Sequence, residues 1–146
     1  MISQKARYAL RALLALARSD PGKTLMIAEI AAEQNIPKKF LEQILLELKA
    51  GGLVRSQRGR RGGYALSRPA GDVTFGEILR LIDGPIALLP CLSQAAYRRC
   101  EDCRSEESCE LRHVFSRVAL ASRAVLDRTS LAAALAAPGL LPSTEP

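Results

Sequence analysis

Apolar residues recur every three or four positions through the first fifty residues, a pattern that indicates amphipathic helices. The first such segment, residues 3–19, is predicted to be a helix that ends at the Asp-Pro-Gly sequence of residues 20–22. Its inward positions are Ala6, Leu10, Leu13, Leu14 and Ala17. The chain is therefore expected to begin with a helix that buries one face.

Two further helical segments follow with a short break between them. Residues 25–35 place Ile27, Ile30 and Ala31 on one side, and Asn35 ends the pattern ahead of a proline at position 37. Residues 38–52 resume it, and a glycine pair at 51 and 52 offers the left-handed residue that ends many helices. The inward stripe of this helix is Leu41, Ile44, Leu45 and Leu48. Two short helices joined by about four residues predict a helix-turn-helix.

The outer face of the third helix carries groups suited to DNA. At about 100° per residue from the leucine stripe, Lys39, Glu42 and Gln43 lie on the far side. Lys38 lies at the edge of the same face. Lysine pairs with phosphate, glutamine with adenine, and glutamate with the amino group of cytosine. A merely solvated helix face has the same composition, so the next segment decides between the two interpretations.

That segment, GLVRSQRGRRGGYALSRP, reads as a basic hairpin. Residues 53–57 and 63–67 are predicted to be extended, and the turn RGRRGG between them has glycines that permit close backbone approach. Its positive charges are Arg55, Arg58, Arg60, Arg61 and Arg68. Such a hairpin directly after a helix-turn-helix is typical of a wing that follows the phosphate backbone or enters the minor groove. DNA binding by Lys38, Lys39, Glu42, Gln43, Arg55, Arg58, Arg60 and Arg61 is the resulting hypothesis.

The C-terminal part of the chain predicts one long helix over residues 110–137. Its apolar positions are Leu111, Val114, Phe115, Val118, Ala121, Val125, Leu131 and Leu135. Residues 138–146 begin with Pro-Gly and are expected to form a loose tail. The apolar stripe either packs back on its own domain or meets a two-fold partner, and a partner would place two DNA-reading heads on two half-sites. A homodimer is therefore expected.

Composition narrows the class of protein. The 146 residues include six aromatic side chains and no Trp, and Ala and Leu dominate, so the fold is expected to be mainly α. A net charge of +6 suits an anionic partner. With no apolar stretch of about 18 residues and no visible signal peptide, we expect a cytoplasmic protein without a membrane partner. No P-loop, GxGxxG or Ser/His/Asp set points to an enzyme.

All four cysteines and the single histidine lie within residues 91–113. The cysteines Cys91, Cys100, Cys103 and Cys109 follow the spacing C-x8-C-x2-C-x5-C, and His113 follows the last with three residues between them. A reducing compartment disfavours structural disulfides, so metal binding or redox chemistry is expected. Three chemistries remain open: an iron-sulfur cluster, a zinc site of four cysteines or three cysteines with His113, and a metal-free thiol switch.

Three blocks of the chain carry a family resemblance. RYALRALLALA, IAEIAAEQNIPKKFLEQILLELKAGGLVRSQRGRRGGYALSRP and VTFGEILRLIDGP resemble successive parts of the Rrf-two family of bacterial winged-helix regulators. The resemblance covers residues 1–85 strongly and the remainder in layout. It implies a homodimer on a palindromic or partly palindromic operator, with the C-terminal helix as the dimer interface. It also implies DNA contacts by Lys39, Glu42, Gln43 and the wing arginines.

The resemblance also favours the iron-sulfur interpretation. Cluster-binding members carry three cysteines in this region and one further ligand, and Cys91, Cys103 and Cys109 match them. Cys100 is additional and is the expected fourth ligand, because the position of an acidic ligand in some members is Arg7 here. His113 lies one residue farther from the last cysteine than a family histidine ligand and is held in reserve. Four cysteines suit a 2Fe-2S and a 4Fe-4S cluster equally.

The sequence thus divides into four parts. Residues 1–85 form the expected winged helix-turn-helix domain, 86–110 the cysteine-rich sensory loop, 111–137 the dimerisation helix and 138–146 the tail. The predicted function is a transcriptional regulator, expected to act as a repressor, that senses redox or iron-sulfur stress. Chemistry at the loop would move one head relative to the other and change operator affinity.

Overall fold

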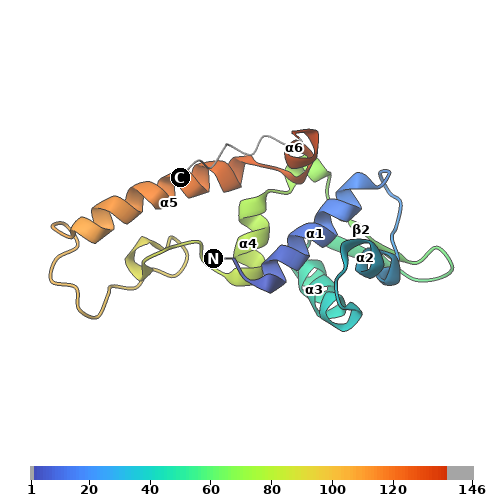
Figure 1. Cartoon of the computed structure of the whole chain (residues 1–146), viewed down its shortest axis with the longest axis horizontal. Helices are drawn as coiled ribbons and strands as arrows, with labels where there is room; N and C mark the ends of the chain where they lie inside the picture. The colour runs from blue at the N-terminus through green and yellow to red at the C-terminus, as the bar shows by residue number, and fades with distance from the viewer. Residues whose placement is uncertain (1, 138–146) are drawn as a thin grey trace.

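The computed structural model describes residues 2–137 and is mainly helical, with one two-stranded sheet. The N-terminal helices are α1 (Gln4–Arg18), α2 (Ile27–Gln34) and α3 (Lys38–Ala50), followed by β1 (Val54–Gln57) and β2 (Gly63–Leu66). After the short 3-10 turn η1 (Ala70–Asp72) come α4 (Phe75–Asp83), the turn η2 (Pro90–Leu92), α5 (Glu110–Arg128) and α6 (Leu131–Ala136). Figure 1 shows an elongated molecule in which α5 extends away from a head built of the other helices and the hairpin. The predicted tail, 138–146, lies outside the described residues.

Helix α1 crosses the centre of the head. Ser3 caps it, because its hydroxyl accepts a hydrogen bond from the Ala6 N–H at 2.9 Å. The buried residues of the helix are Ala6, Ala9, Ala12, Leu13, Ala15 and Leu16. The predicted inward positions Leu10, Leu14 and Ala17 are only half-buried, so the predicted buried face was rotated about the helix axis from the observed one. Alanines lie at the centre because α1 packs against both α3 and α4, and small side chains allow that approach.

The predicted helix-turn-helix is confirmed. Helix α2 ends at Asn35, which has a left-handed φ of 52°, and Ile36 fills the turn as a buried residue. In α3 the predicted stripe of Leu41, Ile44, Leu45 and Leu48 is fully buried. Gly52, at φ 76°, is the left-handed residue after this helix. The stripe fixes the rotation of α3 and therefore which of its side chains face solvent.

The predicted hairpin is also confirmed, and the structure adds a third partner to it. Strands β1 and β2 pair antiparallel from Val54 opposite Leu66 to Gln57 opposite Gly63. Leu25, ahead of α2, exchanges two backbone hydrogen bonds with Tyr64, at 2.9 and 2.8 Å. A Cβ at Gly63 would lie 2.4 Å from the Leu25 carbonyl oxygen, so this close pairing requires glycine. The hairpin, called the wing below, is thus fastened to the helix-turn-helix.

The prediction of one unbroken helix over residues 110–137 was wrong. Helix α5 ends at Arg128, and the chain turns at Thr129 and Ser130 before α6. The Ser130 hydroxyl caps α6 by accepting the Ala133 N–H at 3.0 Å. Leu131 is fully buried in the core of the head, and its N–H donates to the Val73 carbonyl at 2.9 Å. Burial of this leucine with the core favours the turn over a continuous helix, so α6 is part of the winged head, together with α1–α4 and the wing.

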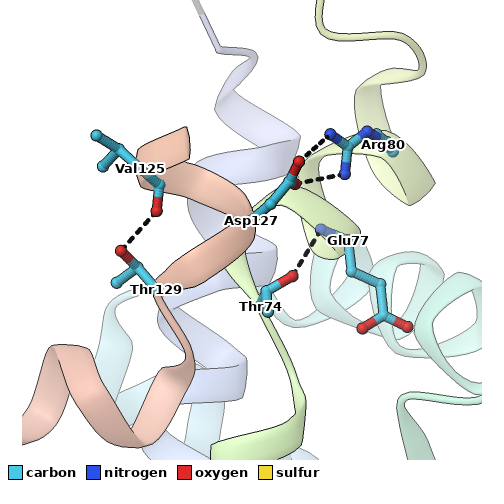
Figure 2. A network of polar contacts seen from close by, with 6 residues as sticks. All are labelled: Thr74, Glu77, Arg80, Val125, Asp127 and Thr129. Carbon is cyan, nitrogen blue, oxygen red and sulfur yellow. Dashed lines mark hydrogen bonds and ion pairs between the residues drawn. The ribbon is translucent and has the colours of Figure 1, made fainter. Parts of the chain in front are cut away.

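Helices α4 and α5 meet at a polar joint, shown in Figure 2. Both terminal nitrogens of Arg80 bind the Asp127 carboxylate, at 2.7 and 2.9 Å. This pairing lowers the pKa of Asp127 and raises that of Arg80. Asp127 lies so close to α4 that a Cβ at Gly76 would come within 2.0 Å of its carboxylate oxygen. The joint therefore sets where α5 leaves the head.

Within residues 2–137, no helix combines the length and apolar character that crossing a membrane requires.

Candidate nucleic-acid interface and cysteine site

The outer face of α3 presents all of the residues predicted for DNA contact on that helix. Lys38, Lys39, Glu42 and Gln43 are exposed, opposite the buried stripe. Phe40, beside them, is also exposed on one side and stacks edge-on against the Tyr8 ring with 5.8 Å between ring centres. The aromatic pair thus joins α3 to α1 at the edge of the polar face, and the long side chains of that face extend into solvent.

The wing contributes the strongest positive charge. Its predicted contact residues Arg55, Arg58, Arg60 and Arg61 are all exposed. The Arg61 carbonyl accepts a hydrogen bond from the Thr24 hydroxyl at 2.7 Å, which ties the wing tip to the segment before α2. Across residues 2–137, the ion pairs use Lys5, Arg68 and Arg80 as cations, so the six lysines and arginines among the predicted DNA-contact residues keep their charges for a partner. Arg68 pairs with Glu77 instead.

The loop of residues 84–109, called the cysteine loop below, runs from α4 to the start of α5. In η2, Cys91 is 6% exposed, and the Leu92 carbonyl accepts a hydrogen bond from Arg123 of α5. The Cys103 N–H donates to the Cys100 carbonyl at 3.1 Å, which closes a turn around the x2 spacing. Cys109 caps α5, because its sulfur accepts the Arg112 N–H at 3.4 Å. The loop is therefore anchored to α5 at both Leu92 and Cys109.

All four cysteines line one cavity of about 450 Å³. Its wall also contains Leu89, Asp102, Arg104, Ser105, Glu106, Ser108, Glu110, Leu111 and Arg112. Desolvation raises the pKa of the Cys100 thiol, and the neighbouring Cys91 raises that pKa further. His113 is absent from the wall, and its Nε2 donates to the Glu107 carbonyl at 2.8 Å. The four cysteines are thus brought together without the histidine.

Two arginines, Arg99 and Arg112, lie at this site, and sequence reasoning missed Arg112. Arg99 donates to the carbonyls of Cys103 and Arg104, both at 3.2 Å, and its own pKa is raised by its contact with Cys103. Arg112 lies in the cavity wall. Its spacing of three residues from Cys109 was the available signal, because positions three apart on a helix share a face.

The arrangement of the four cysteines can be compared with what an iron-sulfur cluster and a zinc ion each require. Within residues 2–137, no three His, Cys, Asp or Glu side chains converge as ligands of a single ion. The four cysteines instead line a wider cavity, and a cluster shares four cysteines among two or more iron atoms rather than placing all of them on one. The cavity also contains a positive side chain, Arg112, able to offset thiolate charge. These residues fit an iron-sulfur cluster better than a single zinc ion.

A helix-turn-helix followed by a basic wing defines a winged-helix DNA-binding protein. The chain belongs to the Rrf2 family, the same family that the sequence motifs resemble. The sequence model of that family, described as an iron-dependent transcriptional regulator, matches residues 2–137. The protein is therefore a transcriptional regulator and not an enzyme.

Individual relatives agree with this assignment. An rrf2-like HTH-type regulator from Rhodobacter capsulatus is 49% identical over 140 residues, covering 94% of this chain and 93% of the relative. The structure of CymR, the global cysteine regulator of B. subtilis, is 31% identical with a TM-score of 0.78, covering 93% of this chain and 96% of that one. T. potens IscR is 27% identical with a TM-score of 0.71, covering 93% and 86%. The likeness thus extends beyond the head to most of the chain.

Proposed function

We propose that this regulator binds a palindromic or partly palindromic operator as a homodimer, and that an iron-sulfur cluster held in the cysteine loop controls that binding. The observation that carries the proposal is the convergence of all four cysteines on one cavity, where the loop joins α5. The exposed cations of α3 and the wing supply the DNA contacts.

The proposed ligands are Cys91, Cys103 and Cys109, with Cys100 as the fourth. A bound cluster would supply one-electron redox chemistry and sensitivity to oxidants. The chain's own contribution is mechanical. Ligation of Cys91 and Cys109 together would hold η2 against the first turn of α5, and α5 is in turn joined to the head by Arg80 and Asp127. Loss of ligation would release this attachment and change how the two heads are spaced.

The proposed dimer uses a stripe of exposed apolar residues on α5. Leu111, Val114, Val118 and Val125 lie on one side of the helix and are 41 to 65% exposed. Such a stripe marks an interaction surface when it is this regular. A second copy of α5 would cover it and give the two-fold symmetry that a palindromic operator requires.

Anaerobic purification tests the cluster directly. We expect visible absorption from sulfide-bridged iron, with iron and acid-labile sulfide present in each chain. Cys103→Ala should remove both and alter affinity for the promoter of the protein's own operon in a gel shift, while the dimer stays intact. Ser108→Ala, in the same cavity wall, is the matched control. Equal operator binding and equal response by wild type and Cys103→Ala would contradict cluster control.

A metal-free thiol switch is the second candidate function, because Cys91 and Cys100 line the same cavity and Cys91 raises the pKa of the Cys100 thiol. Hydrogen peroxide would oxidise the two thiols to a disulfide, taking two hydrogens from them and releasing two molecules of water for each peroxide consumed. This candidate would be favoured if the iron-free protein still binds the operator. On oxidation, its mass should then fall by two hydrogens, and operator binding should be lost at the same time.

A further inference from the structure

Arg112 contacts the cysteine site in two ways, although it is not one of the proposed ligands. Its backbone N–H donates to the sulfur of Cys109 at 3.4 Å. Its side chain lines the same cavity as the four cysteines. Arg112 is therefore placed beside the proposed ligands by its own backbone at the start of α5.

The side chain of Arg112 has an unmet hydrogen-bonding requirement. Its Nε is buried, and it has no hydrogen-bond partner among the described residues. A buried donor on a charged group without an acceptor is unfavourable, so native structures usually supply one. The Nε–H thus indicates that the cavity takes an acceptor that the protein chain itself does not provide.

Neighbouring groups have their partners elsewhere. Arg99 donates to the backbone at Cys103 and Arg104, and Arg123 donates to the Leu92 carbonyl. The Glu106 carboxylate, which also lines the cavity, accepts the hydroxyl of Tyr97. Among the arginines near the cysteine site, Arg112 is consequently distinguished by a buried nitrogen that lacks a partner among the described residues.

We propose that the Arg112 Nε–H donates a hydrogen bond to an anionic sulfur of the group held by the four cysteines. The acceptor is a bridging sulfide or a ligating thiolate, and the two share the same chemistry. This inference rests on the proposed cluster. Hydrogen bonds to sulfur raise the reduction potential of such clusters, and outer partners of a metal site typically change its retention by about 10–100-fold. Arg112 is therefore a positioning and tuning residue rather than a ligand.

The test compares full-length wild type, Arg112→Leu and Arg112→Lys, each reconstituted anaerobically with ferrous iron and sulfide. Arg112→Leu removes the donor, and Arg112→Lys keeps the charge without a nitrogen at the Nε position. Arg117→Leu is the control, because Arg117 is exposed on the same helix. The measurements are iron and sulfide per chain, the half-life of the visible absorbance with a chelator present, and the midpoint potential.

We expect both Arg112 variants to load the cluster, to lose it at least about tenfold faster than wild type, and to have a more negative midpoint potential. Arg117→Leu should match wild type in all three measurements. Wild-type retention and potential in both Arg112 variants would overturn the inference and leave the proposed cluster intact. Wild type that binds its operator but takes up no iron or sulfide would instead overturn the cluster, and the inference with it. If Arg112→Leu fails to fold by circular dichroism, Arg112→Lys decides.

Discussion

At the scale of single residues, the wing depends on the absence of a side chain at one position. Gly63 has a φ of 145° and approaches the backbone of Leu25 where the wing joins the segment before α2. An L residue would be strained there by its own dihedral angle and would collide with a carbonyl that cannot move far. The basic tip is consequently oriented by backbone contacts rather than by its arginines.

Gly63→Ala should therefore lower the free energy of unfolding by about 1–3 kcal/mol, the range for one strained backbone position. Urea denaturation followed by circular dichroism measures the change. Gly71→Ala is the matched control, because a Cβ at Gly71 would meet nothing within 4 Å. Equal stability of the two variants would show that the close pairing of Gly63 with Leu25 does not form.

At the scale of elements, the joint between α4 and α5 links the head to the helix that contacts the cysteine loop. Arg80 donates two hydrogen bonds to the Asp127 carboxylate. At the end of α5, the Thr129 hydroxyl donates a hydrogen bond to the Val125 carbonyl at 2.7 Å (Figure 2). On the same helix, Arg123 holds the Leu92 carbonyl next to Cys91. The polar contacts of α5 thus connect the loop at one point and α4 at another.

Asp127→Asn should weaken this joint by at most about 1 kcal/mol, because both partners are more than a third exposed and such pairs contribute little. The pH dependence has a definite sign. The pKa of Asp127 is lowered in the folded chain, so its stabilisation is present above the ordinary aspartate pKa of about 4 and is lost as pH falls through the folded value.

Urea unfolding of both proteins between pH 3 and 7, conditions chosen to span the carboxylate range, measures this difference. The two should differ at neutral pH and approach each other in acid. Asp20→Asn, an exposed site before α2, is the control and should show no such convergence. A difference that grows in acid would contradict the assignment of the pair.

At the scale of the whole molecule, the distribution of charge and apolar surface separates two tasks. Four exposed arginines lie close together on the wing at one end, and the exposed apolar stripe lies on α5, which extends from the other side of the head (Figure 1). The cysteine loop lies between the head and the start of α5 in the chain. The proposed DNA-binding and dimerisation surfaces are thus different, and variants can test each separately.

Arg58→Ala or Arg60→Ala should weaken operator binding and reduce its salt dependence. Each lost phosphate contact lowers the slope of log K against log salt by about 0.9, and a dimer loses one contact per protomer. Fluorescence anisotropy over a salt series measures the slope. Arg117→Ala, far from the wing in sequence and exposed on α5, should leave it unchanged. Wild-type slopes in both wing variants would remove the wing from the DNA interface.

Val118→Glu should convert the dimer to a monomer, because it buries a carboxylate in the proposed apolar interface. Analytical ultracentrifugation gives the mass. Leu120→Glu is the control: Leu120 is 64% exposed, yet it lies on the opposite side of α5 from the stripe of Val118. A monomeric Leu120→Glu and a dimeric Val118→Glu would place the interface on the other face.

The head was predictable because local patterns specify it. The period of the apolar residues in α3 places Leu41, Ile44, Leu45 and Leu48 on the buried side, and glycines mark the hairpin at the positions where the backbone needs them. The sequence was less informative about α1, where many alanines blur the contrast between faces. It also predicted that the cysteines would meet, since four ligands in one short polar segment have little other reason to gather.

The sequence by itself determined the winged helix-turn-helix, its basic surface and the group of four cysteines, because spacing and charge are local properties. Only the tertiary structure decided where α5 ends, since Leu131 leaves the helix for a core built from distant segments. It also decided which of two side chains in the first turn of α5 faces the cysteine cavity: Arg112 does, and His113 does not. Successive residues of a helix point about 100° apart, so the start of α5 at Glu110 lets Arg112 face the cavity and sends His113 away from it.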